Sequence, residues 1–273
     1  MLTGQGRWHA TRVAWSISMT NFRAGFEYRT DFLLSIALGV MWQSSVVVFA
    51  TVLLTRFPGV GGWTSPQVLL LASMRMCSHG LVALLLGPID MMGRIVREGR
   101  LDAYLLRPLP LFRQVQLSWL SVNALGDLIV AVIMFGCAVS WFDLTWTLWR
   151  VIMLVAGILG GFFMEGAVLV VMSSITMHFT GWQYWSTWLQ GVVTMVSVYP
   201  LSILPLVPHL LLTYLLPVAF IAYIPAAVVT GHVSGTLAPQ WAAVASPLIG
   251  AAAFMAARRL WNWSAQRYQG ANG

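Results

Sequence analysis

Apolar stretches of about twenty residues, the length of helix that crosses the hydrocarbon core of a bilayer, recur along the chain and alternate with short polar segments. No internal repeat or low-complexity segment divides the chain. The pattern predicts an all-α polytopic membrane protein with six transmembrane helices in one domain, residues 1–273. The predicted spans are residues 31–54, 67–88, 114–140, 150–173, 187–205 and 239–258.

The apolar segment 206–231, between the fifth and sixth spans, has a different pattern. It lies in a proline-rich part of the chain, which contains Pro200, Pro205, Pro208, Pro217 and Pro225. Proline removes a backbone donor and breaks or kinks a helix, and broken helices at membrane depth need protein or a water-filled cavity around them. We expect short re-entrant helices that enter from the outer face and return. The alternative is a kinked seventh span, which would place the C-terminus outside.

The segment before the first span, residues 1–30, predicts an amphipathic helix. Its polar positions follow helical spacing: Arg12, Ser16, Thr20, Arg23 and Glu27. Such a helix lies in the headgroup region of the membrane, with its arginines toward anionic lipid. It serves either as a plain membrane anchor or as a grip on a partner.

Composition agrees with a membrane protein, because 59% of the residues are hydrophobic and only 8% are charged. The formal charge of +7 comes from arginines that gather on one side of the predicted topology. These arginines are Arg7, Arg12, Arg23, Arg29, Arg94, Arg97, Arg100, Arg107, Arg113, Arg258, Arg259 and Arg267. Basic residues collect in cytoplasmic loops, so both termini are predicted to be cytoplasmic, and the charge is not taken as a sign of nucleic-acid binding. All 15 basic residues are arginine, a bias that suggests a bacterial inner-membrane protein from a high-GC genome.

The absence of lysine from the sequence excludes two kinds of chemistry. A phosphate-binding P-loop needs its lysine, and so does Schiff-base catalysis. Cys77 and Cys137 both lie inside apolar runs and form no metal motif. We therefore expect no cofactor, no metal and no catalytic residue in this chain, and any ATP and Mg²⁺ must be bound by a partner.

The loop after the second span, residues 89–113, is the densest cluster of charge. Its first part is expected to form a helix with Arg94, Arg97 and Glu98 outward, and Gly99 is expected to interrupt it. Leu101, Leu105 and Leu106 are expected to form a second short apolar face before the prolines at 108 and 110 end the helix. A short amphipathic helix held between two spans suits the binding of a cytoplasmic partner. It also suits a helix that only lies on the bilayer surface.

Residues 97–110, REGRLDAYLLRPLP, resemble the loop signature R-x-G-x-L-D-x-Y-L-L-R-P of ABC-2-type transporter permeases. Residues 216–226 and the tail from Arg267 are similar to that family more weakly. The resemblance implies six spans, an interfacial N-terminal helix and outer re-entrant helices, as in ABC-2 exporters. It also implies a second six-span permease, identical or different, two ABC ATPase subunits that bind ATP and Mg²⁺, and export of drugs, antibiotics or lipids.

On this resemblance, the loop is the site of coupling to the ATPase. The residues that carry this expectation are Arg94, Arg97, Gly99, Arg100, Leu101, Asp102, Leu105, Leu106, Arg107 and Pro108.

Ionisable or polar groups inside the predicted spans form a second set of candidates, because such groups are costly in a membrane. They are Arg75, His79, Asn123, Asp127 and Glu165. Arg75 and His79 are four residues apart and share a helix face. Arg75 and Asp127 reach similar depth, which predicts an ion pair across neighbouring spans, either structural or part of a pathway. Glu165 lies deeper, in a glycine-rich run, and has no predicted partner.

Two other functions are compatible with parts of the sequence. A proton- or ion-coupled secondary transporter would use Arg75, His79, Asp127 and Glu165 as a relay. An intramembrane enzyme is disfavoured, because no H-E-x-x-H motif or paired-carboxylate site is present.

Overall fold

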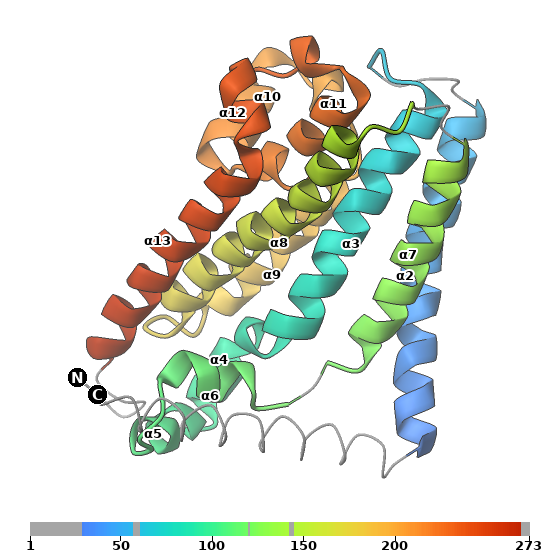
Figure 1. The fold of residues 1–273 in the computed structure, drawn as a ribbon. Coiled ribbons are helices and arrows are strands. Elements are labelled where there is room, and N and C mark those ends of the chain that lie inside the picture. Colours follow the sequence, from blue (N-terminus) through green and yellow to red (C-terminus); the bar gives the residue numbers. More distant parts are fainter. Residues whose placement is uncertain (1–28, 57–60, 120, 142–144, 269–273) are drawn as a thin grey trace.

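The computed structural model describes residues 29–56, 61–119, 121–141 and 145–268 of the chain (Figure 1). All regular secondary structure within these ranges is helical, as the hydropathy pattern predicts. The amphipathic helix predicted over 1–30 lies outside them, except that its last two positions belong to the first long helix.

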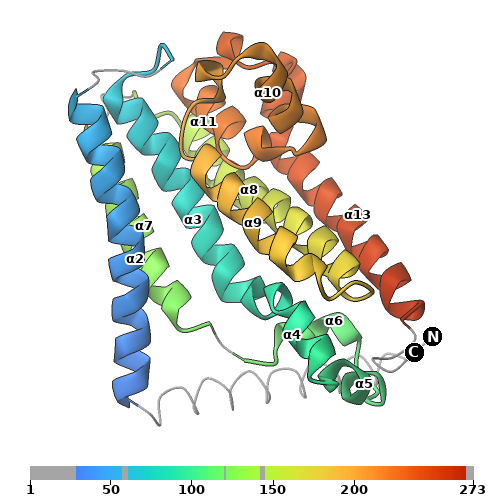
Figure 2. The same ribbon diagram turned by 180° about the vertical axis from the view of Figure 1, so that it is seen from behind.

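Each predicted span coincides with a long helix, and consecutive long helices run in opposite directions (Figures 1 and 2). The long helices are α2 (Arg29–Arg56), α3 (Ser65–Asp90), α7 (Asn123–Trp141), α8 (Leu148–Thr176), α9 (Trp182–Val196) and α13 (Ser246–Gln266). In the described part of the chain, three segments are long and apolar enough by themselves to cross a membrane: Ser65–Arg97, Asn123–Trp141 and Leu148–Thr176. The start of α2 and the end of α13 lie at the same end of the bundle.

Several predicted boundaries are wrong, including the end of the sixth span, where α13 continues to Gln266 rather than 258. Three of them have a local cause. The third span begins at Asn123 rather than 114, because the apolar run is divided into a separate short helix, α6 (Leu111–Gln116), and the span itself. The fifth ends at Val196 rather than 205, before Pro200. The sixth begins at Ser246, after the separate helix α12 (Gln240–Val244), because Pro247 occupies the first turn of a new helix.

Short helices close the end of the bundle opposite to the start of α2 (Figure 1). They are η1 (Leu201–Ile203), α10 (Leu206–Leu210), the π-helical turn η2 (Leu211–Leu215), η3 (Val218–Phe220), α11 (Tyr223–Thr230) and η4 (Val233–Gly235). Residues 206–231 are therefore a series of broken helices, as predicted, and not one kinked helix. Within it, α11 packs against α8 and α3.

Glycines allow α8 to approach α11 and α13 closely. A Cβ at Gly157 would stand 2.7 Å from the Pro225 ring, and one at Gly160 would stand 2.5 Å from Cα of Pro247. Small residues at helix contacts are the usual means of close packing in membranes. The glycine run that surrounds Glu165 in the sequence thus fixes α8 against the short helices and α13.

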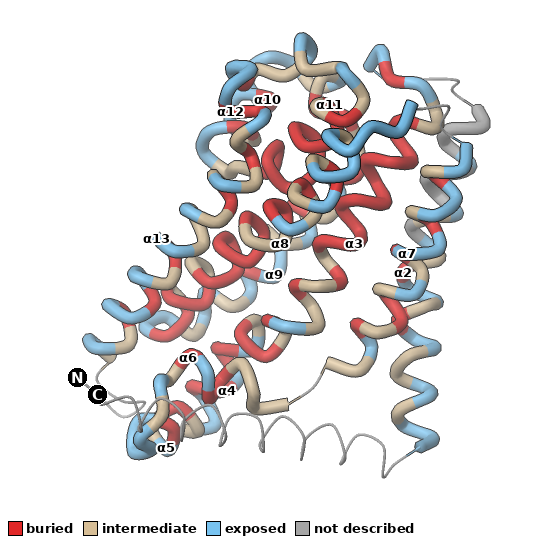
Figure 3. The backbone as a smooth tube through the Cα atoms, in the orientation of Figure 1, coloured by how far each residue is buried: buried red, intermediate tan, exposed pale blue. Residues whose placement is uncertain are grey.

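Two clusters of buried side chains form the core (Figure 3). One joins the first half of α3, together with parts of α7 and α8, to α11 and the short helices beside it. The other lies at the opposite end of the bundle and joins the ends of α3, α8 and α13 to three short helices, α4 (Met92–Arg97), α5 (Arg100–Leu105) and α6. The loop 89–113 is consequently a packed part of the molecule.

Candidate functional site

The loop 89–113 forms a helical hairpin at the end of α3. Gly99 separates α4 from α5 with φ +67°, a left-handed conformation that favours glycine. This confirms the interruption predicted at Gly99. Arg94, Arg97 and Glu98 point outward, also as predicted.

The inner side of this hairpin is fastened to the bundle by buried apolar residues and by glutamines. Ile95 and Leu101 are fully buried. Gln183 of α9 accepts a hydrogen bond from the backbone N–H of Gly93 at 3.0 Å and donates to the backbone oxygen of Asp90 at 2.9 Å. Gln114 of α6 donates to the backbone oxygens of Tyr104 and Leu109. The hairpin is therefore held from both α9 and α6.

The three leucines expected to share an apolar face do not share one. Leu101 is fully buried in the core, whereas Leu105 is 46% exposed and Leu106 is 89% exposed. Leu101 and Leu105 are four residues apart on one helix, but α5 ends at Leu105 and the chain turns toward Pro108. The expectation is corrected to one anchoring leucine and two exposed ones.

Charged and aromatic residues that flank the two exposed leucines in the sequence contact one another. The guanidinium of Arg100 donates to the Tyr104 hydroxyl at 3.0 Å and lies 3.5 Å from Glu98, and Arg107 lies over the Tyr104 ring. Burial lowers the pKa of Arg100, but these two partners outweigh it and the net shift is upward. At the end of the chain, burial and the nearby carboxylate of Asp102 raise the pKa of Tyr268.

Inside the bundle, the buried ion pair of Arg75 and Glu165 forms a polar cluster with His79, which is partly exposed. Arg75 is 1% exposed, and its Nη2 lies 3.1 Å from Oε1 of Glu165. Nδ1 of His79 lies 2.7 Å from the same oxygen. Arg75 also donates through Nε to Ser197 and through Nη2 to Thr194. One guanidinium thus connects α3, α8 and α9.

The predicted ion pair between Arg75 and Asp127 is wrong. Arg75 points toward α8 and α9, and its partner is Glu165, the residue to which no partner was assigned. Counting residues from the membrane surface gives the depth of a side chain but not the direction in which its helix face points. The shared face of Arg75 and His79 is confirmed, since both contact one carboxylate.

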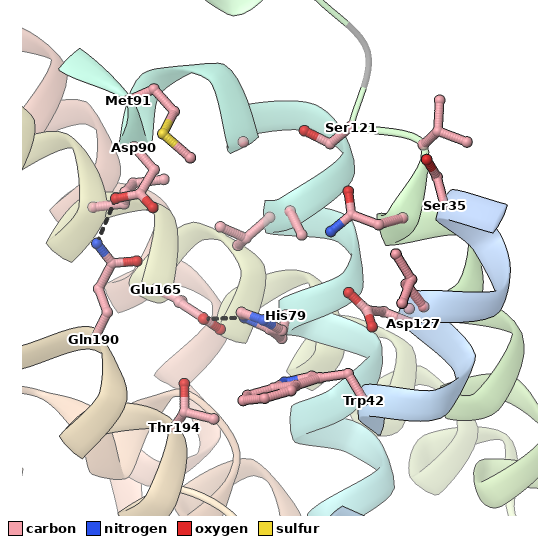
Figure 4. Close-up of a pocket in the computed structure, with 18 of the residues that line it drawn as sticks. Ser35, Trp42, His79, Asp90, Met91, Ser121, Asp127, Glu165, Gln190 and Thr194 are labelled. Carbon is pink, nitrogen blue, oxygen red and sulfur yellow. Dashed lines mark hydrogen bonds and ion pairs between the residues drawn. The ribbon is translucent and has the colours of Figure 1, made fainter. Parts of the chain in front are cut away.

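Asp127 and Asn123 line a cavity of about 1010 Å³ between α2, α3, α7, α8 and α9 (Figure 4). His79 and Glu165 line it from the other side. The structure thus brings four of the five predicted intramembrane residues to one cavity, and Arg75 stands behind Glu165.

Further cavity residues were missed from the sequence: Asp90, Gln190, Thr194, Trp42 and Trp119. Gln190 donates to Oδ1 of Asp90 at 2.7 Å (Figure 4). Gln190 is a polar residue inside a predicted span, so the criterion applied to Asn123 would have found it. Asp90 was assigned to the loop, although it is the last residue of α3.

Helices long and apolar enough to span a bilayer, a buried ionic cluster and a closely packed loop define a polytopic helical membrane protein. Residues 40–272 match the family model described as ABC-2 family transporter protein, and the chain therefore belongs to the ABC-2 transporter family. As a member it is the membrane component of a transporter, a permease that is not itself catalytic. No curated protein and no solved structure matches the chain.

Proposed function

We propose that this chain is the permease subunit of an ATP-driven exporter of the bacterial inner membrane. It pairs with a second six-span permease, identical or different, and two ATPase subunits bind its cytoplasmic face. The substrates are drugs, antibiotics or lipids. The family match supports the permease, and the lack of lysine supports a separate ATPase. The arginines at one end of the predicted topology support cytoplasmic termini.

The α4–α5 hairpin carries the proposal, because it combines a fixed inner side with an exposed tip. Leu106 is 89% exposed at this tip, next to Arg107 and Pro108, which are also exposed. Exposed apolar residues ringed by charge are typical of protein contact sites. In this proposal Leu105 and Leu106 enter a groove on the ATPase, and Arg100 and Arg107 approach its carboxylates.

Force from the ATPase would reach the bundle through the buried side of the same hairpin. ATP closes the two ATPase subunits, each of which pushes the segment from Gly99 to Asp102. Leu101 passes the displacement to the end of α3, and Gln183 passes it to α9. The path between the paired permeases then opens outward.

The test introduces a negative charge at the tip of the hairpin in the complex of permease and ATPase. We expect Leu106→Asp and Arg107→Glu to abolish substrate-stimulated ATPase activity, since buried contacts of this kind contribute about 2 kcal/mol or more each. Leu105→Asp should act in the same direction. The permease should remain inserted at normal levels, because these side chains point away from its core.

Arg150→Glu is the matched control, because Arg150 lies at the start of α8, at the opposite end of the bundle. Substrate-stimulated ATPase activity should be unchanged in this variant. Full coupling in Leu106→Asp and Arg107→Glu would disprove the assignment of the hairpin.

A second candidate function is a proton- or ion-coupled transporter. It is supported by the cluster of Arg75, His79 and Glu165 beside the cavity. Transport that continues without any ATPase and stops when the proton gradient is collapsed would favour it over the exporter.

A further inference from the structure

The cavity between α2 and α9 has an unusual balance of charge. Three carboxylates line it, from Asp90, Asp127 and Glu165, together with one imidazole, from His79. No arginine is among the described residues of its wall, and the chain has no lysine. Arg75 lies behind the wall and is engaged with Glu165 at 3.1 Å. Two carboxylates therefore face the cavity without a cation of their own.

Asp127 is the clearest case. Its residue is only 7% exposed, and its Oδ1 has no hydrogen-bond partner among the residues that the structure describes. The side chain stands at the cavity wall on α7, facing His79 across the space (Figure 4). A buried carboxylate oxygen without a hydrogen-bond partner is costly, so such atoms are normally paired. Oδ1 itself is fully buried, so a ligand in the cavity would compensate the Asp127 carboxylate by its charge rather than by a hydrogen bond to that oxygen.

The remaining walls suit an organic ion better than an inorganic one. The indoles of Trp42 and Trp119 line the space, and aromatic faces attract cations. The guanidinium of Arg94 already lies over the Trp119 ring, which leaves Trp42 as the aromatic face for a bound cation. Apolar side chains such as Leu38 and Val82 lie between the polar groups. Within the described residues, no cluster of side chains suits a metal ion. The volume of about 1010 Å³ is at the upper end of the range for drug-sized ligands.

We propose that this cavity binds amphipathic organic cations, with Asp127 as the principal charge partner and Asp90 as the second. Trp42 would cover the apolar part of the ligand, and the edge of Trp119 would border it. As the substrate class of a transporter, this inference rests on the proposed function. As a binding site, it is testable without the ATPase.

The experiment measures equilibrium binding of tetraphenylphosphonium to the purified full-length chain in lipid nanodiscs at neutral pH. Tetraphenylborate, which has nearly the same shape and the opposite charge, is the matched probe. We expect saturable binding of the phosphonium and at least tenfold weaker binding of the borate. Asp127→Asn should weaken phosphonium binding about tenfold or more, as expected for the loss of a charge in a partly desolvated site. Asp90→Asn should weaken it less.

Asp127→Glu keeps the charge and should retain most of the affinity, which separates an electrostatic role from a folding role. Glu98→Gln removes an exposed carboxylate of the loop and should leave binding unchanged. Borate binding as strong as phosphonium binding would overturn the proposal. So would unaltered phosphonium binding in Asp127→Asn.

Binding measured together with co-purification of the ATPase and with transport separates this inference from the proposed function. A chain that co-purifies with its ATPase but fails to bind tetraphenylphosphonium overturns the cation site alone. A chain that binds the phosphonium at Asp127 but transports on a proton gradient supports the site and overturns the ATP-driven exporter.

Discussion

Arg75 shows how a single buried charge organises the middle of this bundle. It contacts Glu165 on α8 and Thr194 at the end of α9, while Ser197 receives its Nε–H. In a low-dielectric interior, removing one member of such a cluster leaves an uncompensated charge, and that costs more than the pair contributes when intact. Arg75 and Glu165 are therefore expected to be strongly coupled in stability.

We expect Arg75→Met and Glu165→Leu each to destabilise the protein by about 3–5 kcal/mol, the usual cost of breaking a buried ion pair. The double variant should lose much less than the sum, because neither charge is then left alone. Thermal unfolding in detergent, monitored by tryptophan fluorescence, measures the three midpoints. Ser197→Ala is the control, since it removes two hydrogen bonds, one from Arg75 and one to the backbone oxygen of Val193, but no charge, and its midpoint should fall less than that of either charge variant. Additive losses in the double variant would show that the two groups act separately.

Among the elements, the α4–α5 hairpin depends most on one backbone conformation. Gly99 has φ +67° and nothing lies within 4 Å of the position where a Cβ would stand. Any penalty for a side chain there comes from the backbone and not from crowding. Because a left-handed residue joins the two helices, its strain acts directly on how α5 presents Leu106.

A graded series at Gly99 should follow the cost of the left-handed conformation. We expect Gly99→Asn to keep most of the coupling, Gly99→Ala to lose some, and Gly99→Val to lose most, with costs of about 1 kcal/mol or more for the last two. Substrate-stimulated ATPase activity of the complex is the measurement. Gly181→Ala is a suitable control, because Gly181 has φ −63° and nothing lies within 4 Å of the position where its Cβ would stand. Equal activity of the asparagine and valine variants would contradict the conformational argument.

The helices themselves were predictable because the hydropathy pattern is strong, and α2, α3 and α8 lie within a few residues of their predicted spans. The wrong boundaries occur where the apolar pattern is continuous but the helix is interrupted. Residues 114–140 read as one apolar run, yet α6 ends at Gln116 and α7 begins at Asn123.

The site was less predictable, because it depends on which helix faces meet. Arg75, His79 and Glu165 were each identified as costly groups, but the pairing of Arg75 with Glu165 requires the rotation of α8 relative to α3. Asp90 and Gln190 form a contact across 100 residues of sequence. Composition and spacing carry no information about such a contact.

For the whole molecule, the two ends of the bundle have different characters. The end that holds α4–α6 is rich in arginine and presents Leu106, and the end that holds α10–α12 is made of proline-broken helices. The alternation of the long helices places the start of α2 and the end of α13 together at the arginine-rich end (Figure 2). Because basic residues collect in cytoplasmic loops, we expect the arginine-rich end to lie in the cytoplasm and the end that holds α10–α12 to lie outside.

Labelling of single cysteines tests this polarity. In a Cys77→Ala and Cys137→Ala background, we expect a membrane-impermeant maleimide to modify Trp241→Cys in intact cells. Leu106→Cys and Trp263→Cys should react only in inverted vesicles. Trp241, Leu106 and Trp263 are 71%, 89% and 49% exposed on the chain itself, so burial within the protein does not prevent reaction at any of the three positions. Reaction of Leu106→Cys and Trp241→Cys from one side would contradict the two-ended arrangement.

Reaction of Leu106→Cys and Trp263→Cys from opposite sides would mean an odd number of crossings, and residues 206–231 would then have to cross the membrane. The broken backbone at Leu216 and Pro217, together with the burial of α11 against α3 and α8, argues for the even number.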